Sequence, residues 1–88
     1  MMPIHDEERT FTALLSFLED LDRSRIAYRL EHIRDSIMIA LAVPGERWEI
    51  EFFPDGHIEV ERFISSGQIE GKEKLNDLVD RYESEAQA

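Results

Sequence analysis

One stretch decides the fold, and it reads Arg47-Trp48-Glu49-Ile50-Glu51-Phe52-Phe53-Pro54-Asp55-Gly56-His57-Ile58-Glu59-Val60-Glu61-Arg62-Phe63-Ile64. Apolar and charged residues alternate on both sides of Pro54-Asp55-Gly56, which predicts two half-buried strands joined by a turn. With Gly56 as the bulge residue, the register pairs apolar residues on one face and glutamates on the other. The predicted pairs are Phe52 with Ile58, Ile50 with Val60, Glu51 with Glu59, and Glu49 with Glu61.

A second turn signal, Pro44-Gly45, extends this hairpin to a strand from Ser36 to Val43. Pairing Val43 with Glu46 keeps the apolar residues of both strands on one face. A further strand from Arg25 to Glu31, joined through a polar link at 32–35, continues the same face. The predicted pairs are Leu41 with Trp48, Ile39 with Ile50, Ile37 with Phe52, Leu30 with Ile37, Tyr28 with Ile39, and Ile26 with Leu41.

Helical periodicity flanks these strands on both sides. Leucines and Phe11 recur at helical spacing from Asp6 to about Leu21, and a second apolar stripe runs through the segment from Glu70 to Tyr82. Each stripe needs an apolar surface to cover it. We therefore predict an α+β fold with the order α-β-β-β-β-α. In it, residues 1–88 form a single domain, and the N-terminal and C-terminal helices pack on one face of a four-stranded antiparallel meander.

Composition limits the classes of function. Twenty acidic residues against ten basic ones give a formal net charge of −10, which disfavours nucleic acid and anionic lipid surfaces as partners. The lack of cysteine excludes disulfides and thiolate chemistry and fits a reducing compartment. The first residues show no secretory leader, and no segment is long and apolar enough to cross a bilayer. We expect a soluble cytoplasmic protein.

The face of the sheet that the helices leave open is predicted to be acidic along its last two strands. Glu49, Glu51, Glu59 and Glu61 would lie there in adjacent rows, beside Phe53 and Phe63. Directly opposed like charges destabilise a sheet unless water or a partner relieves them. We interpret these six residues as a binding face for a basic protein partner. One alternative is that the acids only keep the domain soluble. Another is that Ala40 and Ala42 merely lie beneath the long Arg29 and Glu49 side chains and that Arg47 covers Phe63.

Two other functions remain open at this point. One is a homodimer in which the open faces meet, with Arg25 or Arg29 against the glutamates of the second copy. The other is a metal site that uses His57 with the glutamates, although His5, His32 and His57 have no zinc-motif spacing. No nucleophile elbow, phosphate loop or dinucleotide fingerprint is present in the sequence. We predict a protein that is not an enzyme and needs no cofactor.

The segment from Val43 to Phe52, followed by Asp55-Gly56 and by Glu59 to Phe63, resembles small acidic bacterial proteins of the immunity-protein type, most of them uncharacterised. The resemblance covers about half of the chain. It implies a cytoplasmic inhibitor that presents carboxylates to a basic toxin, often a nuclease. It assigns no site residues of its own.

Overall fold

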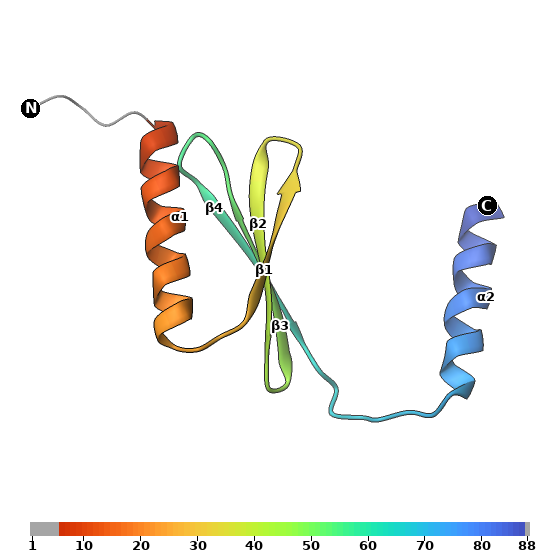
Figure 1. The fold of residues 1–88 in the computed structure, drawn as a ribbon. Helices are drawn as coiled ribbons and strands as arrows, with labels where there is room; N and C mark the ends of the chain where they lie inside the picture. Colours follow the sequence, from red (N-terminus) through yellow and green to blue (C-terminus); the bar gives the residue numbers. More distant parts are fainter. Residues whose placement is uncertain (1–5, 88) are drawn as a thin grey trace, which may run out of the picture.

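The computed structural model describes residues 6–87 and has the predicted order of elements. The elements are α1 (Asp6–Arg23), β1 (Tyr28–Ile33), β2 (Ser36–Val43), β3 (Glu46–Phe52), β4 (Ile58–Ile64) and α2 (Glu73–Gln87). The strands form one antiparallel sheet in the order β1-β2-β3-β4. Figure 1 shows this sheet beside α1. The α+β class and the antiparallel meander are therefore confirmed.

The registers predicted for the last three strands are confirmed pair by pair. Ile39 lies opposite Ile50, and Ile50 lies opposite Val60, so one apolar row runs across β2, β3 and β4. The turn before β4 is closed by the Gly56 N–H, which donates to the Phe53 carbonyl at 3.0 Å. Gly56 has a φ of 94°, a conformation that costs glycine little and other residues more.

The first strand differs from the prediction by two residues. Leu30 pairs with Ile39 rather than Ile37, and β1 spans Tyr28–Ile33 rather than 25–31. Two local features cause the shift. The C-terminal cap of α1 takes up Arg25 (φ 59°) and Ile26, whose N–H donates to the Leu21 carbonyl at 2.9 Å. In addition, the predicted link at 32–35 is only the two-residue turn 34–35. A shift of two leaves every side chain on its predicted face, because the side-chain period of a strand is two.

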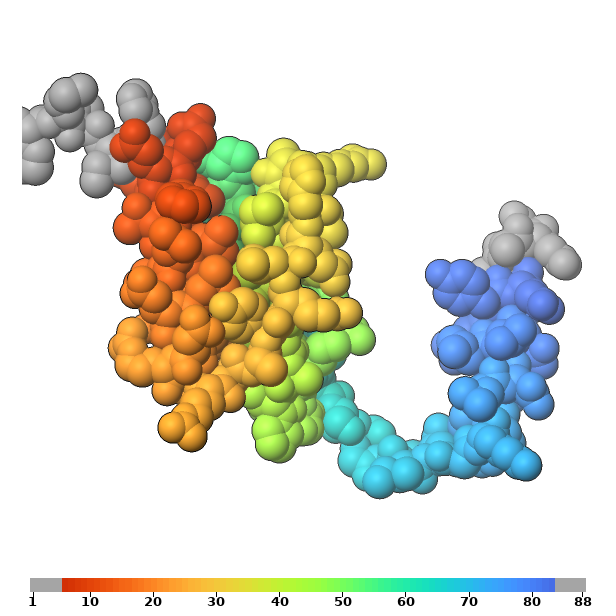
Figure 2. Space-filling model, viewed as in Figure 1, coloured from red at the N-terminus to blue at the C-terminus, as the bar shows by residue number. Residues whose placement is uncertain are grey.

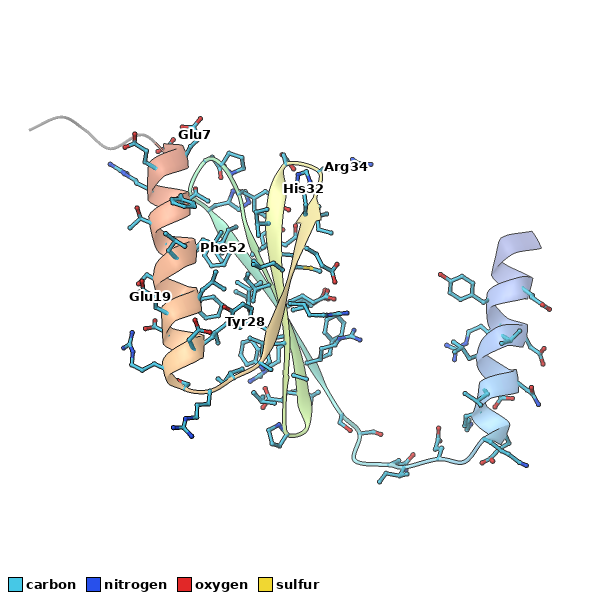
Figure 3. The ribbon with its side chains drawn as sticks, in the orientation of Figure 1. Glu7, Glu19, Tyr28, His32, Arg34 and Phe52 are labelled. Carbon is cyan, nitrogen blue, oxygen red and sulfur yellow. The ribbon has the colours of Figure 1, made fainter. Side chains whose placement is uncertain are left out.

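The core lies between the sheet and α1. Leu21 of α1 and four sheet residues, Ile39, Leu41, Ile50 and Phe52, are buried there. Phe17 of α1 packs against Phe52 with the ring centroids 5.9 Å apart, and Figure 3 shows Phe52 between the sheet and the helix. Burying a side chain of this size stabilises the fold by about 1.5 to 3 kcal/mol. This side of the sheet is therefore the apolar side on which α1 packs.

The second helix departs from the prediction, because α2 does not pack on the sheet. Its apolar side chains, at positions 75, 78, 79 and 82, are between 52% and 72% exposed. Figures 1 and 2 show α2 standing apart from the rest of the molecule. The radius of gyration is 17.8 Å, whereas a compact domain of this length has about 12 Å. The apolar stripe was correctly placed in the sequence, but the linker of residues 65–72 carries it away from its own sheet.

The position of α2 leaves the apolar side of β4 uncovered. Ile58, Val60 and Ile64 on this side are 46% to 68% exposed. Neither α1 nor α2 meets the requirements for a helix that crosses a membrane, within the residues that the structure describes.

Candidate functional site

The four predicted glutamates lie together on the open face of the sheet. Glu49 pairs with Glu61 and Glu51 pairs with Glu59 across β3 and β4, as the turn chemistry predicted. Glu49 and Glu51 are half-buried, and Glu59 and Glu61 on the edge strand are exposed. Because α1 packs on the opposite face, these carboxylates face away from the core. We refer to Glu49, Glu51, Glu59 and Glu61 as the acidic cluster.

Two members of the acidic cluster have neither a basic partner nor a side-chain hydrogen bond within the described residues. Across 6–83, no Lys, Arg or His nitrogen lies within 4.0 Å of the carboxylate of Glu49 or Glu61, nor does either accept a side-chain hydrogen bond. Their charges therefore oppose each other across the ladder, which is unfavourable for the isolated chain. A basic group from outside would relieve this repulsion.

Glu51 is held by a side chain that sequence reasoning missed. The Ser36 hydroxyl lies 2.8 Å from a Glu51 carboxylate oxygen and 3.0 Å from the Ile33 carbonyl oxygen, and its single proton can be donated to one of them at a time. Ser36 is only 3% exposed. A hydrogen bond to a charged acceptor is about twice as strong as a neutral one, so it fixes the direction of the Glu51 carboxylate. The signal was available in the register, because Ser36 is diagonal to Glu51 across β2 and β3.

A histidine occupies one corner of the acidic cluster. The His57 ring stacks on Phe53 with the centroids 4.2 Å apart, and its Nε2 lies 3.2 Å from Glu59. Its Nδ1 contacts the Asp55 carboxylate. The hydrogen bond to Asp55 raises the pKa of His57, with a smaller contribution from Glu59 and an opposing effect of desolvation. The backbone N–H and then the ring of His57 lower the pKa of Asp55. When the ring is protonated, it partly neutralises this corner.

The two aromatic residues of the predicted face are half-buried, and each has one ring face occupied. His57 stacks on Phe53, and the Arg47 guanidinium lies 4.3 Å from the centre of the Phe63 ring. The alternative that Arg47 covers Phe63 is therefore confirmed. Phe53 and Phe63 border the acidic cluster at its two ends, with the His57 ring on one and the Arg47 guanidinium on the other. Their remaining surface is smaller than that of freely exposed rings.

Of the two alanines on the open face of β2, Ala40 is buried and Ala42 is exposed. Ala40 is 7% exposed and lies in one row with Arg29 on β1 and Glu49 on β3. Long side chains on both neighbouring strands flank it, and Arg29 is also paired with Glu31 at 3.5 Å. The candidate surface is therefore the β3–β4 part of the open face and not the whole sheet.

The predicted metal alternative would need side chains that converge on one point. Among the residues that the structure describes, no group of three His, Cys, Asp or Glu side chains has that arrangement. His32 is exposed on β1, away from His57, and His5 lies outside the described residues. Both ring nitrogens of His57 already face carboxylates.

Comparisons with known proteins identify no relative of this chain. The chain matches no protein-family model, no curated protein and no solved structure. The resemblance to immunity proteins therefore stays a prediction.

Proposed function

We propose that this chain is a non-enzymatic protein-binding module whose acidic cluster docks a basic protein partner. The observation that supports the proposal is the pair of opposed glutamate rows, Glu49 with Glu61 and Glu51 with Glu59, on the face opposite α1. Such crowding costs stability in the isolated domain and is offset when a partner supplies cations.

The location of the charges suits recognition by rigid docking. The carboxylates sit on strands rather than on loops, and Ser36 orients Glu51. A single-sign patch on a rigid surface steers an oppositely charged protein and raises the association rate, with an effect that weakens as salt is added. Arg47 on Phe63 and His57 on Phe53 supply a mixed aromatic and polar border to the patch.

The partner class that we infer is a basic toxin, for which this chain acts as an immunity or inhibitor protein in the cytoplasm. A toxin that acts on nucleic acid must carry a basic groove, and a rigid acidic sheet face can block such a groove. The formal net charge of −10 opposes direct binding of nucleic acid by the chain itself. The resemblance over residues 43–63 favours the same partner class.

The test compares two variants of equal charge in affinity capture from the host lysate. One variant changes all four residues of the acidic cluster from Glu to Gln. The control changes Glu8, Glu19, Glu70 and Glu83 to Gln, which are exposed on the two helices and in the linker. Removing four negative charges takes the formal net charge from −10 to −6 in both variants. Quantitative mass spectrometry then measures the basic proteins that each variant retains.

The proposal expects a basic protein that wild type and the control both retain and that the cluster variant loses. Equal retention by both variants would remove the acidic cluster as the binding site. Equal loss from both variants would show that only net charge matters. Circular dichroism checks that each variant is folded before the comparison.

A further inference from the structure

The apolar side of the sheet carries an unfilled groove. It lies between α1 and the edge strand β4, has a volume of about 520 Å³, and is lined by apolar side chains. Phe17 comes from α1, Trp48 and Ile50 form part of the floor, and Ile58 and Val60 form the β4 side. An exposed apolar groove of this kind marks a surface that another element covers.

The chain itself carries an element of matching chemistry. Leu75, Leu78, Val79 and Tyr82 recur at helical spacing and form one stripe along α2, and all four are more than half exposed. Ile69 in the linker is 100% exposed. A single amphipathic helix of 15 residues is marginal in water unless its apolar face packs against something.

We propose that α2 of a second copy of this chain fills the groove, so that two copies exchange their C-terminal helices across a two-fold axis. Each groove then receives one helix, and each helix covers one groove. In this exchange the apolar stripe of α2 still packs on the apolar face of a sheet, as the sequence pattern predicts, but the helix and the sheet belong to different subunits. The interface is on the opposite face from the acidic cluster, so it does not depend on the proposed function.

The linker favours the second copy over the chain's own α2. The Ser65 N–H continues the pairing with the Gly45 carbonyl at 2.9 Å, and then the Ser65 and Ser66 hydroxyls accept hydrogen bonds from the N–H groups of Gly67 and Gln68. Gly67 has a φ of 82°. These local bonds define a linker path that leads away from the sheet, as Figures 1 and 2 show. Short connections that direct an element away from its own domain promote exchange between identical subunits.

Charge also favours α2 as the occupant. Arg62 lies on the groove side of β4, with its guanidinium 5.5 Å from the centre of the Trp48 ring. Between residues 73 and 83, α2 carries four acidic residues and two basic ones. Arg62 is already paired with Glu46 at 3.8 Å, so a net acidic helix would meet a partly neutralised cation at the groove edge.

The apolar area alone brings the exchange to the lower end of specific interfaces. Three exposed apolar side chains on β4 and four on α2 would be covered in each copy. At roughly 60 to 100 Å² of apolar area for each partly exposed side chain, a symmetric exchange buries about 800 to 1,400 Å², which reaches the range of specific interfaces.

Disulfide cross-linking distinguishes an α2 helix of the same chain from that of a second copy. The chain has no native cysteine, so only the introduced thiols can form a disulfide. The double variant Val60→Cys with Leu78→Cys places one thiol in the groove and one on the stripe of the full-length chain. Oxidation at low micromolar concentration is expected to give a covalent dimer on a non-reducing gel. A matched control, Glu59→Cys with Leu78→Cys, puts the strand thiol on the opposite face and is expected to cross-link at least tenfold less.

Two results of the cross-linking experiment would overturn the proposal. A monomer with an internal disulfide would mean that α2 docks on its own sheet. No cross-link, together with a sedimenting mass equal to the 10.3 kDa of one chain, would mean that neither copy supplies the helix and that another protein covers the groove.

A complementation experiment tests the exchange without a covalent bond. Leu78→Asp damages the helix stripe and leaves the groove intact, whereas Val60→Asp damages the groove and leaves the stripe intact. Both positions are more than half exposed, so the sheet and α1 should stay folded, which circular dichroism checks. Each variant alone is expected to sediment as a monomer, and the mixture is expected to form a heterodimer with one filled groove. A mixture that stays monomeric while wild type is dimeric would refute helix exchange.

Discussion

Replacing Glu61 with Gln should stabilise the isolated protein. Glu61 lies directly opposite Glu49, and within residues 6–83 neither carboxylate has a basic partner within 4.0 Å. Gln keeps the size and the hydrogen-bonding capacity of the side chain and removes only the charge. The change therefore relieves the repulsion and leaves the packing of β4 as it is.

The magnitude follows from the geometry of the pair. Two unit charges about 6 Å apart in water repel each other by about 0.7 kcal/mol, and opposed charged pairs in sheets contribute about 0.2 to 1 kcal/mol. For a domain of this size, such a gain raises the midpoint of thermal unfolding by about 1 to 8 °C. Because Glu59 also interacts with His57, Glu59→Gln should give a smaller gain.

Thermal unfolding followed by far-ultraviolet circular dichroism measures this difference at low ionic strength and again in 1 M NaCl. The gain should vanish in the salt solution, where the screening length falls to about 3 Å. Glu19→Gln, on exposed α1 surface, removes the same charge and should leave the midpoint nearly unchanged. A Glu61→Gln protein that is less stable than wild type, or a gain that persists in 1 M NaCl, would refute the reasoning.

Three further predictions concern the core, the buried hydroxyl and the histidine. Ile39→Ala should destabilise the fold by about 2 to 5 kcal/mol in urea titrations, because Ile39 is 0% exposed. A loss of stability no larger than that caused by Ile58→Ala, at a half-exposed position, would contradict the assigned core. Ser36→Ala should cost about 1.5 to 3 kcal/mol in the same assay through the lost hydrogen bond to Glu51, and a neutral effect would contradict that bond. The His57 ring should titrate above pH 6.5 by NMR. Because the folded pKa of His57 is raised, the stability that its protonation contributes is present below pH 6.5 and is lost as the pH rises through the folded pKa. The stability of the His57→Gln protein should not fall in this pH range. An NMR titration midpoint of His57 at or below pH 6.5 would contradict its contacts with Asp55 and Glu59.

The sequence was sufficient for β2, β3 and β4 because two strong turn signals set their registers. Pro44-Gly45 and Asp55-Gly56 place glycines where the backbone has positive φ, and the alternating pattern then leaves one choice of face. The register of β1 was wrong because its boundaries depend on Arg25 and Arg34. Both residues adopt positive φ, a backbone conformation that is uncommon for residues other than glycine and that the sequence pattern did not predict.

The location of α2 could not be derived from its apolar stripe. Periodicity shows that a helix needs an apolar partner, and it does not show whether the same chain supplies it. The candidate site, too, could be predicted from the sequence only in part. The rows of the acidic cluster follow from register alone, whereas the Ser36 hydrogen bond to Glu51 and the stacking of His57 on Phe53 depend on side-chain rotamers.

The central claim is that the acidic cluster guides a basic protein onto the open face of the sheet. The most direct test is the association rate of the captured partner, measured by stopped-flow fluorescence between 20 and about 500 mM NaCl, a range that spans strong to weak screening. The variant with all four cluster residues changed to Gln should associate at least about tenfold more slowly at low salt and show a flatter salt dependence than the charge-matched control. Identical rates and salt slopes for the two variants would contradict the claim.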